Sequence, residues 1–131
     1  MAGEQYIIEL AQLEQEADRY QEQMQMLDQQ IEEIQSIQRS LNEIDKSKEN
    51  TIYANLGKNI FIKTQITGKD LLVDVGNKTF VKKDIPGTMK VIEDQITKII
   101  EAKGKIVTKL QEIQENMQKI VEQAEKENEK K

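Results

Sequence analysis

Residues 51–83 read TIYANLGKNIFIKTQITGKDLLVDVGNKTFVKK, and along this stretch apolar and polar side chains alternate. Alternation of this kind is typical of β-strands, whose side chains point to opposite faces in turn. Short segments that contain Gly or Asn, residues that tolerate positive φ, interrupt the pattern. The stretch therefore predicts two β-hairpins. Their four strands are expected at residues 51–56, 60–66, 71–75 and 79–83.

Apolar side chains fall on both faces of these predicted hairpins. Ile60 and Ile62 share one face of their strand, whereas Phe61 lies on the other face. Two short hairpins cannot bury both faces or pair their outer edges by themselves. We therefore expect this region to assemble with other chains. The expected assembly residues are Ile52, Ile60, Phe61, Ile62, Leu72, Val73, Val75, Phe80 and Val81.

The segment before the hairpins, residues 1–46, carries apolar residues at alternating intervals of three and four. With Gln, Glu and Asp on the remaining faces, this heptad spacing is typical of a helix that packs against one other helix. Ile37 and Ile44 widen the apolar face near its end. The a positions are Leu10, Ala17, Met24, Ile31 and Gln38, and the d positions are Tyr6, Leu13, Tyr20, Leu27, Ile34 and Leu41.

The segment after the hairpins, residues 88–131, repeats the same rhythm. Lys103, at an a position, and its neighbour Gly104 interrupt the apolar pattern. An interior Gly costs a helix roughly 1 kcal/mol relative to Ala. We interpret the interruption as a local defect, with a hinge as the alternative. The a and d positions are Met89, Ile92, Ile96, Ile99, Lys103, Ile106, Leu110, Ile113, Met117, Ile120 and Ala124.

The two heptad segments have nearly equal lengths, each roughly 60 Å at 1.5 Å per residue. Because they flank a compact insert, the simplest arrangement folds one back antiparallel to the other. The β-branched Ile at the d positions from 92 to 120 also disfavours parallel pairs. The expected fold is mainly α with a small β insert, a long antiparallel coiled-coil hairpin flanking two β-hairpins. We expect three parts, at residues 1–46, 47–87 and 88–131.

The composition excludes several kinds of chemistry. The 131 residues include no Cys and no His, so disulfides, thiolate metal sites and Cys or His catalysis are ruled out. No constellation of carboxylates or lysines suggests a catalytic site, so no enzyme, metal or cofactor is expected. A net charge of −5 disfavours a nucleic-acid partner. The first residues lack a basic and apolar signal pattern and no run is long enough for a membrane span, which predicts a soluble intracellular protein.

Two strings within the hairpins resemble a known family. Residues 56–63 read LGKNIFIK and residues 71–83 read LLVDVGNKTFVKK. Both resemble the paired hairpin signature of the prefoldin alpha subunit, and the order of coiled coil, two hairpins and coiled coil extends the resemblance over the whole chain. Asn59 and Lys78 replace the second Gly of each Gly-x-Gly. Asn can hold positive φ, whereas Lys78 predicts a slightly different turn.

The resemblance implies an assembly and an activity. Members form hexamers of two alpha and four beta subunits, in which the hairpins join into a double β-barrel platform. Their coiled coils hold non-native polypeptides without ATP and pass them to a group II chaperonin. The implied partners are therefore beta-class prefoldin subunits, non-native protein clients and that chaperonin, with no nucleic acid and no membrane. The implied compartment is the cytoplasm of an archaeal-type cell.

The free tip of an antiparallel hairpin consists of its two chain ends. Ile7 and Ile8 occupy outward e and f positions there, and apolar side chains exposed at a tip suit the capture of unfolded chains. The alternative is that both residues pack on the partner helix. We expect a polar, disordered tail at 125–131. A structural scaffold that oligomerises through its hairpins is the alternative function. The expected tip residues are Ile7, Ile8, Leu10, Met117, Ile120 and Val121.

Overall fold

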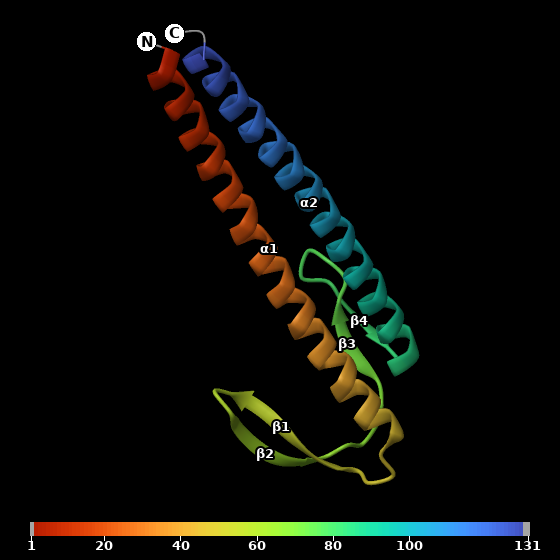
Figure 1. Cartoon of the computed structure of the whole chain (residues 1–131). Helices are drawn as coiled ribbons and strands as arrows, with labels where there is room; N and C mark the ends of the chain where they lie inside the picture. The colour runs from red at the N-terminus through yellow and green to blue at the C-terminus, as the bar shows by residue number, and fades with distance from the viewer. Residues whose placement is uncertain (1, 130–131) are drawn as a thin grey trace. The chain divides into compact units, whose positions relative to one another are not determined.

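The computed structural model describes residues 2–129 and contains two long helices and two β-hairpins, as expected (Figure 1). Each of the four strands ends within one residue of its predicted bounds. In chain order the elements are α1 (Ala2–Lys46), β1 (Thr51–Gly57), β2 (Ile60–Gln65), β3 (Leu71–Asp74), β4 (Phe80–Lys83) and α2 (Ile85–Glu129).

The chain divides into two compact units, each of which contains part of both helices. The helical unit comprises Met1–Ile31 and Thr97–Lys131, whereas the hairpin unit is Glu32–Ile96. The last turns of α1 and the first turns of α2 thus belong with the strands. The apolar face of α1, widened at Ile37 and Ile44, is consistent with this division, because helix surface in the hairpin unit meets strands as well as a helix.

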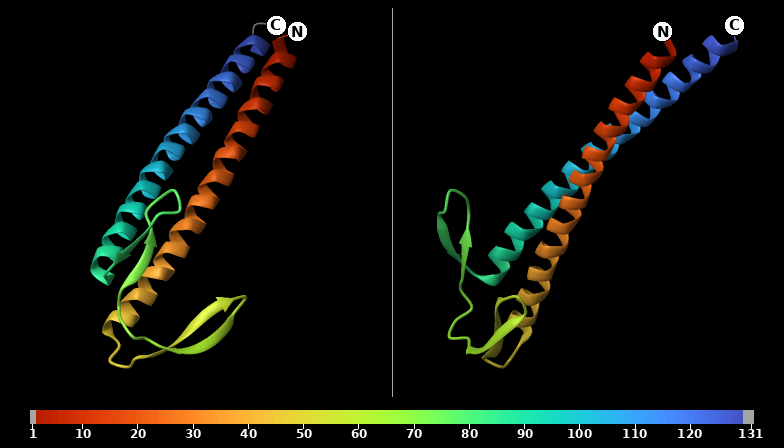
Figure 2. Two further views of the ribbon diagram at one scale, coloured as in Figure 1. Left: turned by 180° about the vertical axis from the view of Figure 1, so that it is seen from behind. Right: turned by 90° about the vertical axis from the view of Figure 1, so that its left-hand side faces the viewer.

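The helical unit is an antiparallel coiled coil whose seam follows the predicted heptads. Within it α1 and α2 lie side by side and run in opposite directions (Figure 2). Between Tyr6 and Ile31 and between Ile99 and Ala124, its a and d side chains are buried or half-buried, whereas those at b, c, e and f are exposed. Ile106 and Ile113 are the buried members. The narrow apolar stripe therefore packs against one partner helix.

The interruption at residues 103 and 104 leaves α2 unbroken. Lys103 is half-buried in the seam, and its ammonium lies 2.5 Å from the Asp28 carboxylate of α1. The Thr108 hydroxyl donates a hydrogen bond to the carbonyl oxygen of Gly104 at 3.2 Å. The polar residue in the seam thus has a charged partner.

The hairpin unit has its own small apolar core. Leu41 of α1 and Ile85 and Ile92 of α2 are buried together. Leu71 of β3 packs against this cluster, so the second hairpin is anchored to the helices. The other side chains packed against the cluster are Ile34, Ile44, Met89 and Ile96.

The strands form two separate antiparallel pairs, β1 with β2 and β3 with β4. No barrel exists within residues 2–129, so a barrel requires further chains. The two central residues of each turn have positive φ, Lys58 and Asn59 in the first and Asn77 and Lys78 in the second, and each pair follows a Gly with positive φ. Two such residues are typical of type I′ hairpin turns.

Lys78 has the same left-handed backbone as its counterpart in the first turn. Its φ of 58° matches the 61° of Asn59, the equivalent residue of the first turn. Each turn also has the same polar brace, since the side chains of Asn55 and Asp74 each accept a hydrogen bond from the Gly backbone N–H two residues later. The two turns of this chain therefore share the backbone conformation of their last residue and the same polar brace.

Helix α2 extends beyond its predicted range at both ends. It begins at Ile85, because Asp84 caps it and accepts a hydrogen bond from the Gly87 N–H at 2.8 Å. Pro86 is tolerated in the first turn, where its missing N–H has no helical partner to lose. The expected disordered tail is wrong for residues 125–129, which are helical, and residues 130–131 lie outside the described part.

Neither helix of residues 2–129 contains a stretch apolar enough, over a sufficient length, to span a bilayer.

Candidate functional site

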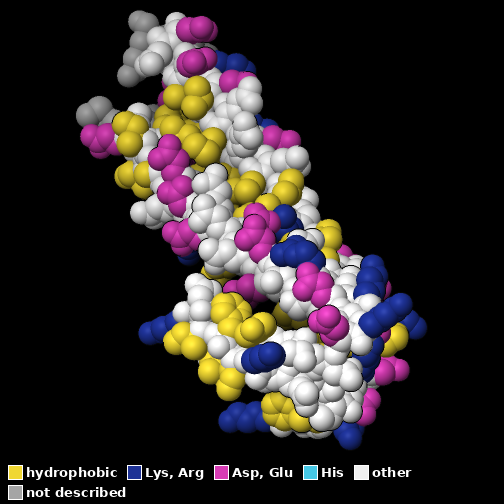
Figure 3. Space-filling view, turned by 90° about the horizontal axis from the view of Figure 1, so that it is seen from below, with side chains coloured by type: hydrophobic (Ala, Val, Ile, Leu, Met, Phe, Trp, Pro, Cys, Tyr) yellow, Lys and Arg dark blue, Asp and Glu magenta, His cyan; other side chains and the backbone are white. Residues whose placement is uncertain are grey.

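Large apolar side chains are exposed in both units. Soluble monomers seldom expose contiguous apolar patches, and such patches commonly mark interaction sites. Figure 3 shows yellow apolar side chains at the surface of one face of the molecule, beside acidic and basic ones. We call the exposed set of the two β-hairpins the strand surface and that of the helical unit the coil surface; Ile37 of α1, in the hairpin unit, is exposed as well. The strand surface consists of Tyr53, Leu56, Ile60, Phe61, Ile62, Leu72, Val75, Phe80 and Val81. The coil surface consists of Ile7, Ile8, Met26, Ile100, Val107 and Val121.

The strand surface contains seven of the nine expected assembly residues. Ile52 and Val73 are half-buried instead. Val73 alternates with Leu72, which is 73% exposed and lies on the opposite face of β3. The half-buried face of β3 thus meets the helices, because Leu71 packs on the core, and Leu72 points away from it.

The first hairpin exposes apolar side chains on both faces, as expected. Ile62 lies opposite Ala54, whereas Phe61 lies opposite Asn55 on the other face. Tyr53 shares that second face and pairs with Lys63. In the described chain each sheet has only two strands, so each strand keeps one edge without a strand partner. Open edges and apolar faces together suit the addition of strands from other chains.

The tip of the helical unit carries three of the six expected tip residues at its surface. Ile7 is 68% exposed and Val121 is 43% exposed, and Ile8 is likewise exposed. The chain ends that form this tip lie at the same end of the coiled coil (Figure 2). The other three residues, Leu10, Met117 and Ile120, are half-buried at a and d positions of the seam.

A hydrogen bond joins the two helices at the tip. The Tyr6 hydroxyl donates to Glu127 Oε1 at 2.8 Å. This hydrogen bond is the main cause that raises the pKa of Tyr6 above its ordinary value, with the nearby carboxylate charges adding to it. The contact holds the end of α2 against α1, so the exposed Ile7 and Ile8 project from an ordered helix.

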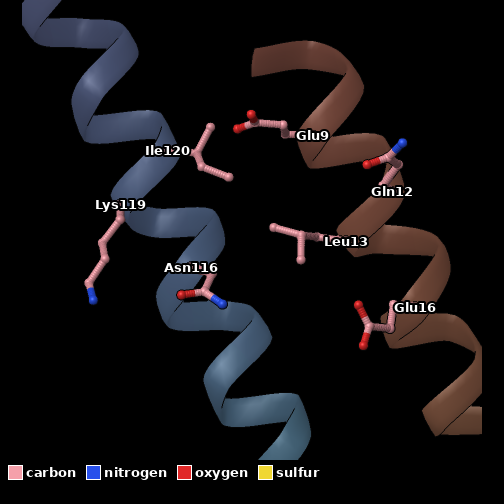
Figure 4. A pocket seen from close by; sticks show the side chains of 7 residues that line it. All are labelled: Glu9, Gln12, Leu13, Glu16, Asn116, Lys119 and Ile120. Atoms are coloured by element: carbon pink, nitrogen blue, oxygen red, sulfur yellow. The ribbon is translucent and has the colours of Figure 1, made fainter. Parts of the chain in front are cut away.

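A shallow groove of about 390 Å³ lies between the helices near the tip. In Figure 4, Leu13 of α1 and Ile120 of α2 point toward each other across the seam, and polar side chains surround them. Among residues 2–129 no cluster of acidic side chains could hold a metal ion. The groove suits binding of a partner through direct side-chain contacts. The groove is lined by Glu9, Gln12, Leu13, Glu16, Asn116, Lys119 and Ile120.

Ile100, Val107 and Met26 are exposed but were not among the expected tip residues. Ile100 and Val107 precede Val121 at multiples of seven residues, so all three occupy e positions of α2. The heptad frame that identified Val121 could therefore have identified them. Met26 lies at a c position of α1, outside the seam, and is exposed.

Comparisons with known proteins agree with this architecture. The family model described as prefoldin subunit matches residues 13–130. A solved filamentous prefoldin from Methanocaldococcus jannaschii is similar in fold, with a TM-score of 0.65 and 19% sequence identity over 92% of this chain and 95% of that chain. No protein of curated function matches. Since the family model covers most of the chain, this protein belongs to the prefoldin family of chaperone subunits.

Proposed function

We propose that this chain is an alpha-type prefoldin subunit that holds non-native polypeptides at its coiled-coil tip, without ATP. The observation that carries the proposal is the exposure of Ile7, Ile8 and Val121 at the free end of the helical unit. Apolar side chains there cover no core of this chain and are available to apolar segments of an unfolded partner. Such contacts need no shaped cavity, which suits clients of varied sequence.

The proposed assembly contains two of these chains and four beta-class prefoldin subunits. Two hairpins with open edges and exposed apolar faces support the alpha type, because beta-class subunits carry one hairpin. The hairpins would complete a β-barrel platform by adding strands from neighbouring subunits. The proposed recipient of the clients is a group II chaperonin, and the proposed compartment is the cytoplasm.

A filament of this chain alone is the competing assembly. The solved structure with a similar fold is described as filamentous prefoldin. The chain would then meet copies of itself through the same strand surface. A structural scaffold, the alternative function, would use this surface without holding clients.

Suppression of aggregation tests the proposed function. The assembled complex is added to a chemically denatured test protein, and light scattering is followed after dilution. The triple variant Ile7→Ser, Ile8→Ser, Val121→Ser should lose most of the protection, while its native mass stays unchanged. Unaltered protection would reject the tip as the holding site, and an inactive wild-type complex would favour the scaffold.

The matched control is Met26→Ser. Met26 is 60% exposed on the same unit but lies away from the tip. It should keep the protection of the wild-type complex. An equal loss in the control would mean that any loss of exposed apolar area weakens holding.

A further inference from the structure

The antiparallel coiled coil of the helical unit has two chemically different flanks. In an antiparallel pair, the e positions of both helices lie on one flank and the g positions on the other. Asp28, at an e position of α1, forms an ion pair with Lys103 of α2. This contact agrees with an e flank that the two helices share. Glu9 and Asn116, both at g positions, line one groove on the opposite flank. Met26 and Lys105, both at c positions, line a second groove there.

The e flank carries an apolar stripe along α2. Ile100, Val107 and Val121 are exposed at e positions, with Val107 at 42%. Neighbouring e positions lie about 10 Å apart along the helix axis at 1.5 Å per residue. Gln114 occupies the e position between Val107 and Val121. At the tip, Ile7 at an e position of α1 continues the apolar surface on the same flank.

Apart from Lys103, which is paired with Asp28, the charges around this stripe are negative. In the described part of the helical unit, no Lys or Arg occupies a b, e or f position. The basic residues outside the seam lie at c and g positions: Arg19, Lys98, Lys105, Lys109, Lys119 and Lys126. Lys103, in the seam, is paired with Asp28. The acidic residues at b, e and f positions are Glu4, Glu14, Asp18, Glu22, Asp28, Glu101, Glu115, Glu122, Glu125 and Glu129.

We propose that the e flank binds segments of non-native polypeptides that combine apolar side chains with Lys or Arg. The inference rests on the proposed holding function and adds the chemical class of the client segment. The apolar stripe would take the apolar side chains, while the carboxylates beside it, such as Glu14 and Asp18, would attract the basic ones. The bound segment would lie along the coil, so the binding surface would reach from the tip back toward Ile100.

The same charges argue against other occupants of this flank. A second copy that presented its own e flank would set carboxylates against carboxylates, which is unfavourable. Nucleic acids and anionic lipid surfaces are negative as well, and both attract Lys and Arg clusters. A segment with apolar and basic side chains is complementary to both features of the flank.

Two synthetic peptides with identical apolar residues test the charge preference. One carries Lys and the other Glu at the remaining positions, and each is titrated with the assembled complex at low salt by fluorescence anisotropy. The Lys peptide should bind roughly three- to tenfold more tightly, since a few exposed charge pairs contribute little each. The difference should shrink at 0.5 M salt, where charges are screened. Equal affinities at low salt would overturn the proposal.

Matched variants locate the site of binding. Glu14→Lys on the e flank should weaken binding of the Lys peptide, whereas Glu112→Lys, at a c position on the opposite flank, should weaken it much less. Val107→Ser should weaken both peptides, and Met26→Ser neither. Gln114→Leu, which completes the stripe, should strengthen both. If the two members of either matched pair behave alike, the flank is not the site.

Two further outcomes separate this inference from the proposed function. If the wild-type complex suppresses aggregation but Val107→Ser has full peptide affinity, the tip holds clients and the e flank does not. If Gln114→Leu makes complexes associate, as measured by sedimentation, and leaves peptide affinity unchanged, the flank is an interface between copies. That result also overturns the proposal. A wild-type complex that protects no client rejects the proposed function itself.

Discussion

The ammonium of Lys103 lies 2.5 Å from Oδ1 of Asp28, so the one basic residue in the seam of the described helical unit is paired across the two helices. The side chain of Lys103 is 29% exposed and that of Asp28 is 56% exposed. Water therefore screens the pair, and its contribution to stability is small. Its position still matters, because a polar residue at an a position favours one register of a coiled coil over others.

Replacing Lys103 by Leu should stabilise the isolated chain by about 1 kcal/mol, since an apolar side chain fills an apolar seam without desolvating a charge. Asp28→Ala should destabilise it by less than about 1 kcal/mol, as expected for an exposed pair. Thermal unfolding followed by helical circular dichroism measures both. A lower melting temperature for Lys103→Leu would mean that the pair stabilises the coil more than an apolar contact could.

The hydrogen bond from Tyr6 to Glu127 should fail at alkaline pH. Because the folded-state pKa of Tyr6 is raised above its ordinary value of 10.0, the stabilising contact is complete below pH 10. It is lost as the pH rises through the raised value, when the tyrosinate can no longer donate and faces a carboxylate. Tyrosinate absorbance and helical circular dichroism, recorded together, should show a small loss of helix in that range.

Tyr6→Phe is the matched variant for this titration. It lacks the hydroxyl and should show less helix at neutral pH but no further loss attributable to residue 6 above pH 10. If helical circular dichroism falls identically at alkaline pH in the wild-type and Tyr6→Phe chains, the hydrogen bond does not hold the tip.

Two residues of the second hairpin turn, both with positive φ, give opposite predictions when they are replaced. Lys78 has a φ of 58°, so Lys78→Gly should remove the steric cost of its Cβ and stabilise the hairpin by up to about 1 kcal/mol. Gly76 has a φ of 122°, where an L side chain is strained, and Gly76→Ala should destabilise it by about 1 kcal/mol or more. Chemical denaturation of the isolated chain measures both. Effects of the same sign would contradict the turn geometry.

Much of the fold was predictable because its periodicities are strong. The heptads identified the seam, since a helix that packs on one neighbour needs apolar residues only at a and d. The strands followed from alternation and from turn residues. The start of α2 was harder, because Pro86 and Gly87 read as interruptions until Asp84 is seen to cap the first turn.

The candidate surfaces were only partly predictable. Ile7, Ile8 and Val121 stood out because they lie outside the seam at the chain ends. Residues 125–129 were expected to be disordered from their charge, yet Tyr6, distant in sequence, provides a partner for Glu127. The sequence does not show which face of β3 meets the helices. It therefore could not predict that Val73 is half-buried and Leu72 exposed.

Leu72→Asp should abolish assembly while leaving the isolated chain folded. Leu72 points away from the core of the hairpin unit, so a charge there costs little in the free chain but is unfavourable in an apolar interface. Native mass and helical circular dichroism are measured together. Val73→Asp is the comparison, and it should also lower the stability of the free chain because Val73 is half-buried. An intact complex with Leu72→Asp would remove β3 from the assembly surface.

The most direct test of the account is the native mass of this chain mixed with a beta-class prefoldin subunit. One species with two of these chains and four partner subunits should form, and it should be absent with Leu72→Asp. A chain that ignores the partner, and forms only its own dimer or a filament, would contradict the assignment as an alpha-type subunit.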